Sequence, residues 1–159
     1  MPKLDLAAVP VRSGCSYPQQ FHRIAGDLTG NSWQALGDAA GLTQFGVNRC
    51  VYPPGAASSL RHWHTEEDEF VIVLEGELVL VTDDGETSLR AGDMAGFPKG
   101  APNGHHLRNK SLRPAVVLEI GTRSENDECF YSDVDMRARS PAQGGGYVTR
   151  AGAPYPKDQ

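Results

Sequence analysis

Short apolar runs, separated by glycine, proline and acidic turns, dominate the middle of the chain. Runs of this kind, rich in valine, isoleucine, leucine and aromatic residues, are typical of β-strands. We predict a short strand through His62 and His64. Further strands are predicted at 42–52, 69–74, 78–82, 86–89, 94–97, 105–109 and 115–120. Turns such as Asp83-Asp84-Gly85 favour hairpins, because glycine takes a positive φ at little cost. The pattern therefore predicts an all-β domain.

The strand that contains the run FVIVL has apolar side chains on both of its faces. Side chains alternate across a strand, so Phe70, Ile72 and Leu74 share one face while Val71 and Val73 share the other. A strand of this composition is covered on both sides. The pattern favours a barrel or sandwich whose outer face is also buried, for example against a second copy of the chain.

The two ends of the chain are patterned less regularly than the middle. A helix is predicted at 32–40, capped by its first residue, a serine, and stopped by Gly41. We divide the chain into an N-terminal arm at 1–41, a barrel core at 42–121 and a C-terminal extension at 122–159. Both end segments are expected to wrap around the core or to be partly mobile.

Composition and charge narrow the class of protein. A length of 159 residues suits one domain with a proper core. The net charge of -5, without a stripe of lysine or arginine, argues against nucleic-acid binding. Neither a secretory signal nor an apolar run of about 20 residues is present, so we expect a cytoplasmic protein without a membrane partner. Cys15, Cys50 and Cys129 show no CxxC spacing, which argues against a disulfide framework or a zinc knuckle.

His62 and His64 are separated by one residue and stand just before a buried strand. Side chains two residues apart in extended backbone lie on one face, about 6.6 Å apart. A metal at about 2.1 Å from each nitrogen fits between them. Glu69 shares its strand face with the buried valines, which makes it the best third ligand among the acidic residues that follow. A surface pair of histidines often has no function, so at this point a metal site and no site both remain open.

A third candidate histidine arrives in the segment GDMAGFPKGAPNGHHLRN, at 92–109. With this segment the sequence resembles the cupin superfamily over about 42–121. Cupins carry one motif with a glycine, an HxH pair, a glutamate and a closing glycine, and a second with a glycine, a PxG turn, a histidine and an asparagine. The matching residues are Gly55, His62, His64, Glu69 and Gly76, then Gly92, Pro98, Gly100, His105 and Asn109. The chain departs from the family by one extra residue before the first histidine and two before the last.

The resemblance implies a double-stranded β-helix, or jelly-roll barrel, that holds one divalent metal. Its ligands would be His62, His64, Glu69 and His105. The insertion leaves the neighbouring His106 as an alternative to His105. His105 shares a strand face with Asn109, whereas His106 lies on the opposite face, so we expect His105 to be the ligand.

The choice of metal limits the chemistry. Six-coordinate iron, manganese or nickel would keep two positions open for substrate, whereas tetrahedral zinc would be closed unless a ligand moved. Glu119 interrupts an apolar strand and is our candidate acid or base, although an ion pair with an arginine at the barrel rim explains it equally well. Arg49 and Tyr52 are candidate substrate contacts, or simply surface residues of their strand.

Two classes of function stay open. One is a small metal-dependent enzyme that acts on an acidic or sugar-like molecule, such as a dioxygenase, isomerase, epimerase or lyase. The other is a non-catalytic ligand-binding or regulatory module with a structural metal, since a fold does not by itself assign an activity. The open coordination favours the enzyme. Cupins similar to this chain commonly exchange an N-terminal strand between subunits, so we also expect a homodimer.

Overall fold

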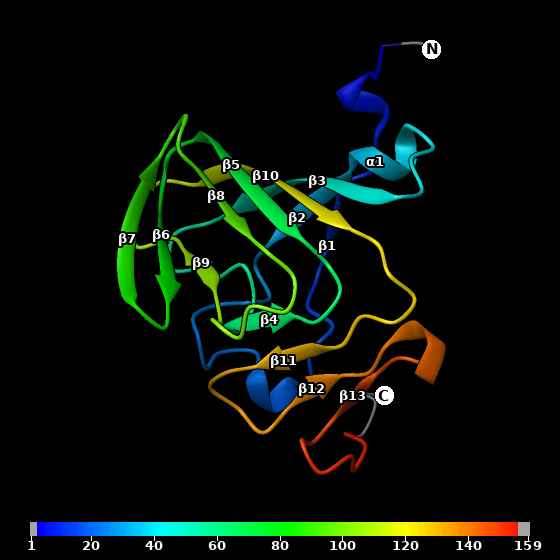
Figure 1. The fold of residues 1–159 in the computed structure, drawn as a ribbon. Helices are drawn as coiled ribbons and strands as arrows, with labels where there is room; N and C mark the ends of the chain where they lie inside the picture. Colours follow the sequence, from blue (N-terminus) through cyan, green and yellow to red (C-terminus); the bar gives the residue numbers. More distant parts are fainter. Residues whose placement is uncertain (1–2, 156–159) are drawn as a thin grey trace.

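The computed structural model describes residues 3–155, which form mostly short antiparallel strands (Figure 1). The strands are β1 (Arg12–Ser13), β2 (Ser32–Ala35), β3 (Phe45–Tyr52), β4 (His62–His64), β5 (Glu69–Glu75), β6 (Glu77–Thr82), β7 (Gly85–Arg90), β8 (Met94–Phe97), β9 (His106–Arg108), β10 (Ala115–Thr122), β11 (Cys129–Tyr131), β12 (Arg137–Ala138) and β13 (Tyr147–Val148). The helical segments are α1 (Leu36–Ala39) and the 3₁₀ turns η1 (Leu6–Ala8), η2 (Gln19–Phe21) and η3 (Pro141–Gln143). Each of these helical segments is too short to cross a membrane. The predicted all-β class is confirmed.

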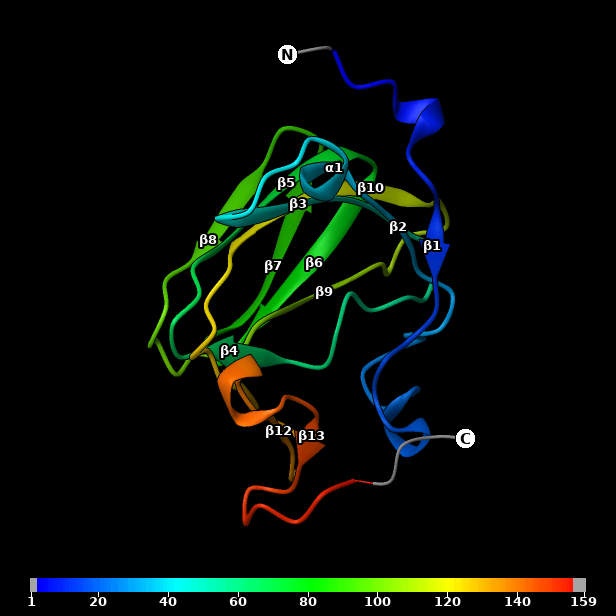
Figure 2. The same ribbon diagram turned by 90° about the vertical axis from the view of Figure 1, so that its right-hand side faces the viewer.

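Two layers of strands form the wall of the barrel. One layer is a six-stranded sheet in the order β1-β2-β3-β10-β5-β8. The other is made of a three-stranded sheet, β7-β6-β9, and a four-stranded sheet, β13-β12-β11-β4, which an isolated bridge between His62 and His105 connects. Figures 1 and 2 show these layers facing each other, with β4 at one end of the barrel. This is the jelly-roll architecture expected from the sequence.

The alternation of side chains along the strands builds the core between the layers. Val71, Val73 and Val117 are buried on the inner face of the large sheet, and they belong to one cluster with Leu78 and Leu107 of the three-stranded sheet. Burial of each such side chain contributes about 1.5–3 kcal/mol of hydrophobic free energy. Side chains on the inner face of the large sheet therefore point into the barrel, and candidate functional residues on that face do the same.

A second cluster joins the two ends of the chain beneath β4. Phe21 and Leu28 of the N-terminal segment are buried with Tyr131 and Met136 of the C-terminal extension. The described part of the extension is thus packed against the barrel, and it brings further side chains to the histidine strand.

Gly76 closes the first motif at the tight turn between β5 and β6. Its φ is +77°, and a Cβ added there would lie 2.9 Å from the carbonyl oxygen of Pro114. Both the left-handed conformation and the close approach require glycine.

The predicted helix at 32–40 is wrong over its first half. Ser32–Ala35 is the strand β2, in which Trp33 pairs with Cys50 of β3, and only Leu36–Ala39 is helical. The N-cap is Ala35 rather than the serine. Pairing with an open sheet edge satisfies the backbone of these residues, which outweighs their local preference.

Candidate metal centre and active-site cavity

Four side chains from the two motifs converge on one point inside the barrel. Glu69 Oε2 lies 3.5 Å from His62 Nε2, 3.6 Å from His64 Nε2 and 2.9 Å from His105 Nε2. Two ligand atoms that each stand about 2.1 Å from a shared ion are about 3.0–3.4 Å apart at octahedral or tetrahedral angles. The three distances from Glu69 are close to these values. The ligand atoms of His62, Glu69 and His105 also lie within 4.8 Å of one another, so these three residues could hold one divalent ion, with His64 beside Glu69.

Strand geometry explains why these side chains meet. In β4 the alternation turns His62 and His64 to one side and Trp63 to the other, where its ring stacks on Phe130 at 4.9 Å. Glu69 begins β5 on the same face as the buried valines, as expected. The ring of His105 stacks on Phe97 with centroids 3.6 Å apart, which fixes its plane.

Hydrogen bonds on the far side of two rings hold the histidines in position. His64 Nδ1 is 2.6 Å from Asp127 Oδ2, and His62 Nδ1 is 2.8 Å from the carbonyl oxygen of Leu60. Both bonds require a proton on Nδ1, so in the neutral imidazole the lone pair that a metal would need is on Nε2, on the side of Glu69. Metal-binding histidines are typically oriented in this way by a carboxylate or a carbonyl. His105 Nδ1 is buried and finds no hydrogen-bond partner within residues 3–155.

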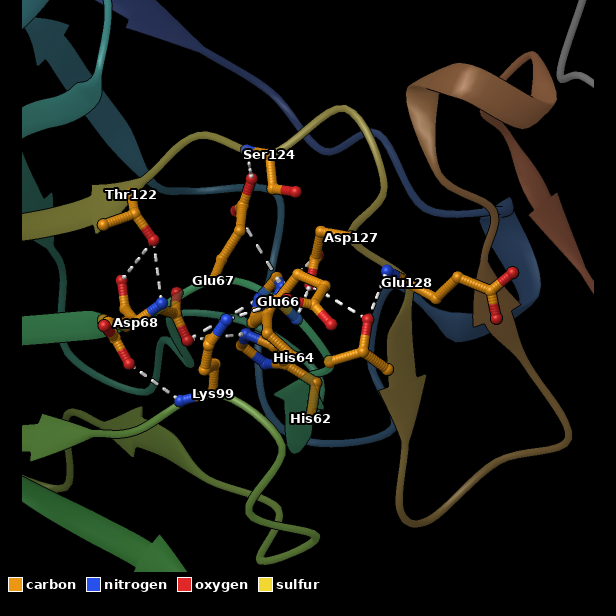
Figure 3. Close-up of polar contacts among 12 residues, drawn as sticks. His62, His64, Glu66, Glu67, Asp68, Lys99, Thr122, Ser124, Asp127 and Glu128 are labelled. Carbon is orange, nitrogen blue, oxygen red and sulfur yellow. Dashed lines mark hydrogen bonds and ion pairs between the residues drawn. The ribbon is translucent and has the colours of Figure 1, made fainter.

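Figure 3 shows that Asp127 reaches His64 from the loop that leads into β11. Asp127 is itself held by the backbone N–H of Glu66, which donates to Oδ1 at 2.8 Å. Beside it, the backbone N–H of Ser124 donates to Glu67 at 2.7 Å. The C-terminal extension therefore supports the histidine strand directly.

The charges within the cluster favour an ionised carboxylate. Burial alone would raise the pKa of Glu69, but hydrogen bonds to His105 and His62 outweigh it and hold that pKa well below the usual range. Burial likewise acts to lower the pKa of His62, yet the adjacent Glu69 carboxylate raises it overall. Glu69 is consequently charged and able to act as a ligand at physiological pH.

The structure separates the two neighbouring histidines of the second motif. His105 stands beside Glu69, whereas the ring of His106 is buried elsewhere and its Nδ1 is 2.9 Å from the carbonyl oxygen of Ser59. None of the potential metal-binding groups found among residues 3–155 includes His106. The geometry thus agrees with the register expected from strand parity.

A cavity of about 580 Å³ extends from this cluster to Glu119 in β10. The phenol of Tyr52 donates a hydrogen bond to Glu119 Oε1, and the thiol of Cys50 donates to Oε2 at 3.2 Å. Burial raises the pKa of Glu119, and these two hydrogen bonds moderate the rise. Glu119 forms no ion pair with any arginine in the described chain, so the rim-pair explanation is not supported.

The two residues predicted to touch substrate have different positions. Tyr52 is a buried core residue bonded to Glu119, so the alternative that it is a surface residue is wrong. Arg49 pairs with Leu118 of β10, whereas its neighbour Asn48 pairs with Glu119. The side chain of Arg49 therefore lies on the face of the sheet opposite to Glu119. Arg49 is absent from the residues that line the cavity, and the predicted substrate contact is not supported for it.

Sequence reasoning missed Asp127 and Cys50. The role of Cys50 could have been predicted, because Cys50 is two residues from Tyr52 and therefore shares its strand face. No sequence pattern pointed to Asp127, since it stands in an irregular acidic stretch and reaches the site only because Cys129 pairs with His64.

Comparisons with known proteins agree with this fold. The family model of the cupin domain matches residues 48–121. A sugar phosphate isomerase of the cupin superfamily from Silicibacter pomeroyi is 47% identical to this chain, with 99% of each chain covered and a TM-score of 0.90. The chain belongs to the cupin superfamily.

Other solved cupins are more distant from this one. A candidate sugar phosphate isomerase from Acidithiobacillus ferrooxidans is 29% identical, with a TM-score of 0.72 over 80% of this chain and 81% of its own. A predicted oxalate decarboxylase from Thermotoga maritima is 18% identical, with a TM-score of 0.62 over 77% of this chain and 100% of its own, and shows the shared fold alone. No curated protein matches this cupin.

Proposed function

We propose that this cupin is a metal-dependent isomerase of a small phosphorylated sugar. The observation that carries the proposal is the Glu119 carboxyl, which lines the same cavity as the three histidines and Glu69. Aldose–ketose isomerisation moves a proton between two adjacent carbons of an open-chain sugar, which requires a base beside a polarised carbonyl. Similarity to a sugar phosphate isomerase over the full length of the chain supports the same substrate class.

The ligand set proposed for the metal is His62, His64, Glu69 and His105. Three neutral imidazoles and one carboxylate leave a divalent ion with net positive charge, and with iron, manganese, nickel or an expanded zinc site it would polarise a bound carbonyl. Glu119 would take the proton from the hydroxyl-bearing carbon next to that carbonyl and return it to the carbonyl carbon, while the hydroxyl proton of the first carbon passes to the former carbonyl oxygen. Tyr52 and Cys50 fix the carboxyl, so its orientation is set before substrate arrives.

Arg139 is the proposed partner of the substrate phosphate. Arg123 and Arg139 are the arginines that line the cavity within the described residues. Arg123 is already paired with Asp38 and the carbonyl oxygen of Leu42. Arg139 donates from Nε to the carbonyl oxygen of Gly145 at 3.0 Å but forms no ion pair in residues 3–155, so its terminal nitrogens remain available to an anion.

The test is an isomerase assay on a panel of phosphorylated aldoses and ketoses and their unphosphorylated forms. Arg139→Gln should lower kcat/KM for the phosphorylated sugars about 10- to 100-fold, the effect of losing a hydrogen-bonded charge pair, and leave the others unchanged. Arg90→Gln is a matched control, because Arg90 is an exposed arginine of β7 outside the cavity. Binding without turnover across the panel would favour the ligand-binding module.

A homodimer remains part of the proposal. Phe70, Leu74 and Met94 lie on the outer face of β5 and β8 and are exposed by 37%, 41% and 58% in the single chain. An apolar face of this kind is typical of an interface. Light scattering at micromolar concentration should give the mass of two chains, and a monomer mass would contradict it.

A further inference from the structure

A second chamber of about 310 Å³ lies behind Glu119, between the N-terminal segment and the barrel. Figure 2 shows that segment running along one side of the barrel. Tyr52 and Cys50, which hold the Glu119 carboxyl, line this chamber but not the main cavity, whereas the candidate metal ligands line the main cavity but not this chamber. Glu119 lines both, so its carboxyl has the candidate metal on one side and a separate space on the other.

The second chamber has a buried polar atom in its wall that needs a hydrogen-bond donor. Asn31 is 7% exposed, and its Nδ2 donates to the carbonyl oxygen of Ala57 at 2.7 Å. That bond fixes the orientation of the amide and identifies Oδ1 as the remaining acceptor. Asn31 Oδ1 finds no donor among residues 3–155. A buried carbonyl oxygen left without a donor costs about 1–3 kcal/mol, so we expect a water molecule to satisfy it.

The rest of the chamber wall also suits water. Asn48 stands directly opposite Glu119 in the β3–β10 ladder, so the two side chains share a face, and within the described residues no hydrogen bond forms to the Asn48 amide. Gly14 and Ser16 line the chamber and are exposed, so solvent has access to it. A volume of about 310 Å³ holds several waters, since one water occupies roughly 30 Å³ in the liquid.

Water on this side of Glu119 has a consequence for the proposed isomerisation. Glu119 carries a proton between its removal from one carbon and its return to the next. During that interval the sugar occupies the main cavity, so the second chamber is the side from which water reaches the carboxyl. The carboxyl O–H gives its proton to a chamber water and takes a different proton back, so neither group changes its charge. Hydrogen from the sugar is thereby replaced by hydrogen from solvent.

We propose that the second chamber is a water-filled route for proton exchange, in which Asn31 and Asn48 hold water against Glu119 from the side opposite the sugar. The inference rests on the proposed function. It makes Asn31 a positioning residue, which acts on the reaction through water and does not touch the sugar. A base closed off from solvent would instead return the same hydrogen to the sugar.

Isomerisation in D₂O tests the route on the metal-loaded protein, with the phosphorylated sugar that turns over fastest. NMR of the product at low conversion measures the ratio of deuterium to hydrogen at the carbon that receives the proton. Wild-type protein should place deuterium on most product molecules. A crystal structure of the same protein should show a water within hydrogen-bond distance of Asn31 Oδ1.

Two variants of the chamber wall separate the route from the chemistry. Asn31→Leu keeps the branched shape but removes the acceptor, so it should lower the deuterium ratio about three- to tenfold, the effect of losing a neutral hydrogen bond. Its kcat should stay near the wild-type value, because Glu119 still returns a proton to the sugar. Ser32→Leu puts an apolar side chain in the chamber wall and should act in the same direction. Gln20→Ala, which changes an exposed amide outside both spaces, serves as the control.

The outcomes distinguish the route from the proposed function. Wild-type product that keeps the hydrogen of the sugar, or a deuterium ratio that neither variant lowers, would overturn the route and leave the isomerase standing. A crystal structure without water at Asn31 Oδ1 would overturn the route as well. Absence of turnover on every sugar of the panel would overturn the proposed function, and the proton-exchange role with it.

Discussion

At one end of the cavity, four candidate ligands come from two sequence motifs, and at the other a single carboxyl is held by two side chains of a neighbouring strand. At the first end, local spacing places two of the four ligands together, because His62 and His64 share a face of β4 wherever that strand lies. The second end exists only in the folded sheet, since Glu119 meets Tyr52 and Cys50 through the register of β10 on β3. The two histidines of β4 therefore stay on one face together, whereas Glu119 keeps its two partners only in the observed register of β10 on β3.

The largest expected effect is on metal content. His64→Ala should reduce bound metal from one equivalent to near zero, because it removes one of four ligands, and His105→Ala should do the same. His106→Ala should keep about one equivalent, since that ring is bonded to Ser59. Elemental analysis of purified protein measures all three. Full metal content in His105→Ala together with loss in His106→Ala would reverse the assignment.

The next effect separates the acid–base end from the ligand end. Glu119→Gln should lower kcat about 10²- to 10⁴-fold, the usual range for a lost general base, while metal content stays at the wild-type level. Glu86→Gln, which changes an exposed carboxyl of β7, should leave both unchanged. Loss of metal in Glu119→Gln would show that Glu119 also contributes to metal binding. Retained turnover would show that Glu119 is not the general base.

A smaller effect is expected from the carboxylate behind His64. Asp127→Asn should weaken metal affinity about 10- to 100-fold, because His64 loses the partner that orients its ring. Competition with a chelator measures the affinity. Asp133→Asn is the matched control, since Asp133 belongs to the same extension but pairs with Arg61. Equal affinities in wild type and Asp127→Asn would show that the extension does not tune the metal.

The smallest effect is a shift in the pH profile. In the proposed mechanism the base form of Glu119 is the active one, so kcat/KM should fall as pH falls through its raised pKa. The hydrogen bond from Tyr52 stabilises the carboxylate, and Tyr52→Phe should therefore raise the pKa of Glu119 further. The negative charge of Glu69 raises the pKa of Glu119 and the nearby His62 lowers it, and both residues are unchanged in the variant.

The acidic limb in Tyr52→Phe should consequently begin at higher pH than in wild type. Profiles of kcat/KM for the two proteins measure the shift. An acidic limb that stays in place, or moves to lower pH, would show that Tyr52 does not act on Glu119.

Much of the barrel was predictable because local signals and the tertiary fold agree there. The apolar alternation of β5 and the turn glycines placed most central strands within a few residues of their bounds. The prediction failed where a segment takes its structure from a neighbour. Ser32–Ala35 is a strand because the edge of β3 is beside it, and β11 forms against β4 without a strong pattern of its own.

The sequence by itself predicted the all-β class, because that class depends on side-chain alternation along single strands. The jelly-roll form and the four candidate ligands followed from the resemblance of its two motifs to those of the cupins. The sequence also nominated Glu119 as an unusual charge in an apolar strand. Only the tertiary structure decided that Tyr52 and Cys50 hold that carboxyl, that Asp127 supports His64 and that Arg49 faces away. Those facts depend on strand register and on contacts between segments more than 60 residues apart, as from His64 to Asp127, which no local pattern encodes.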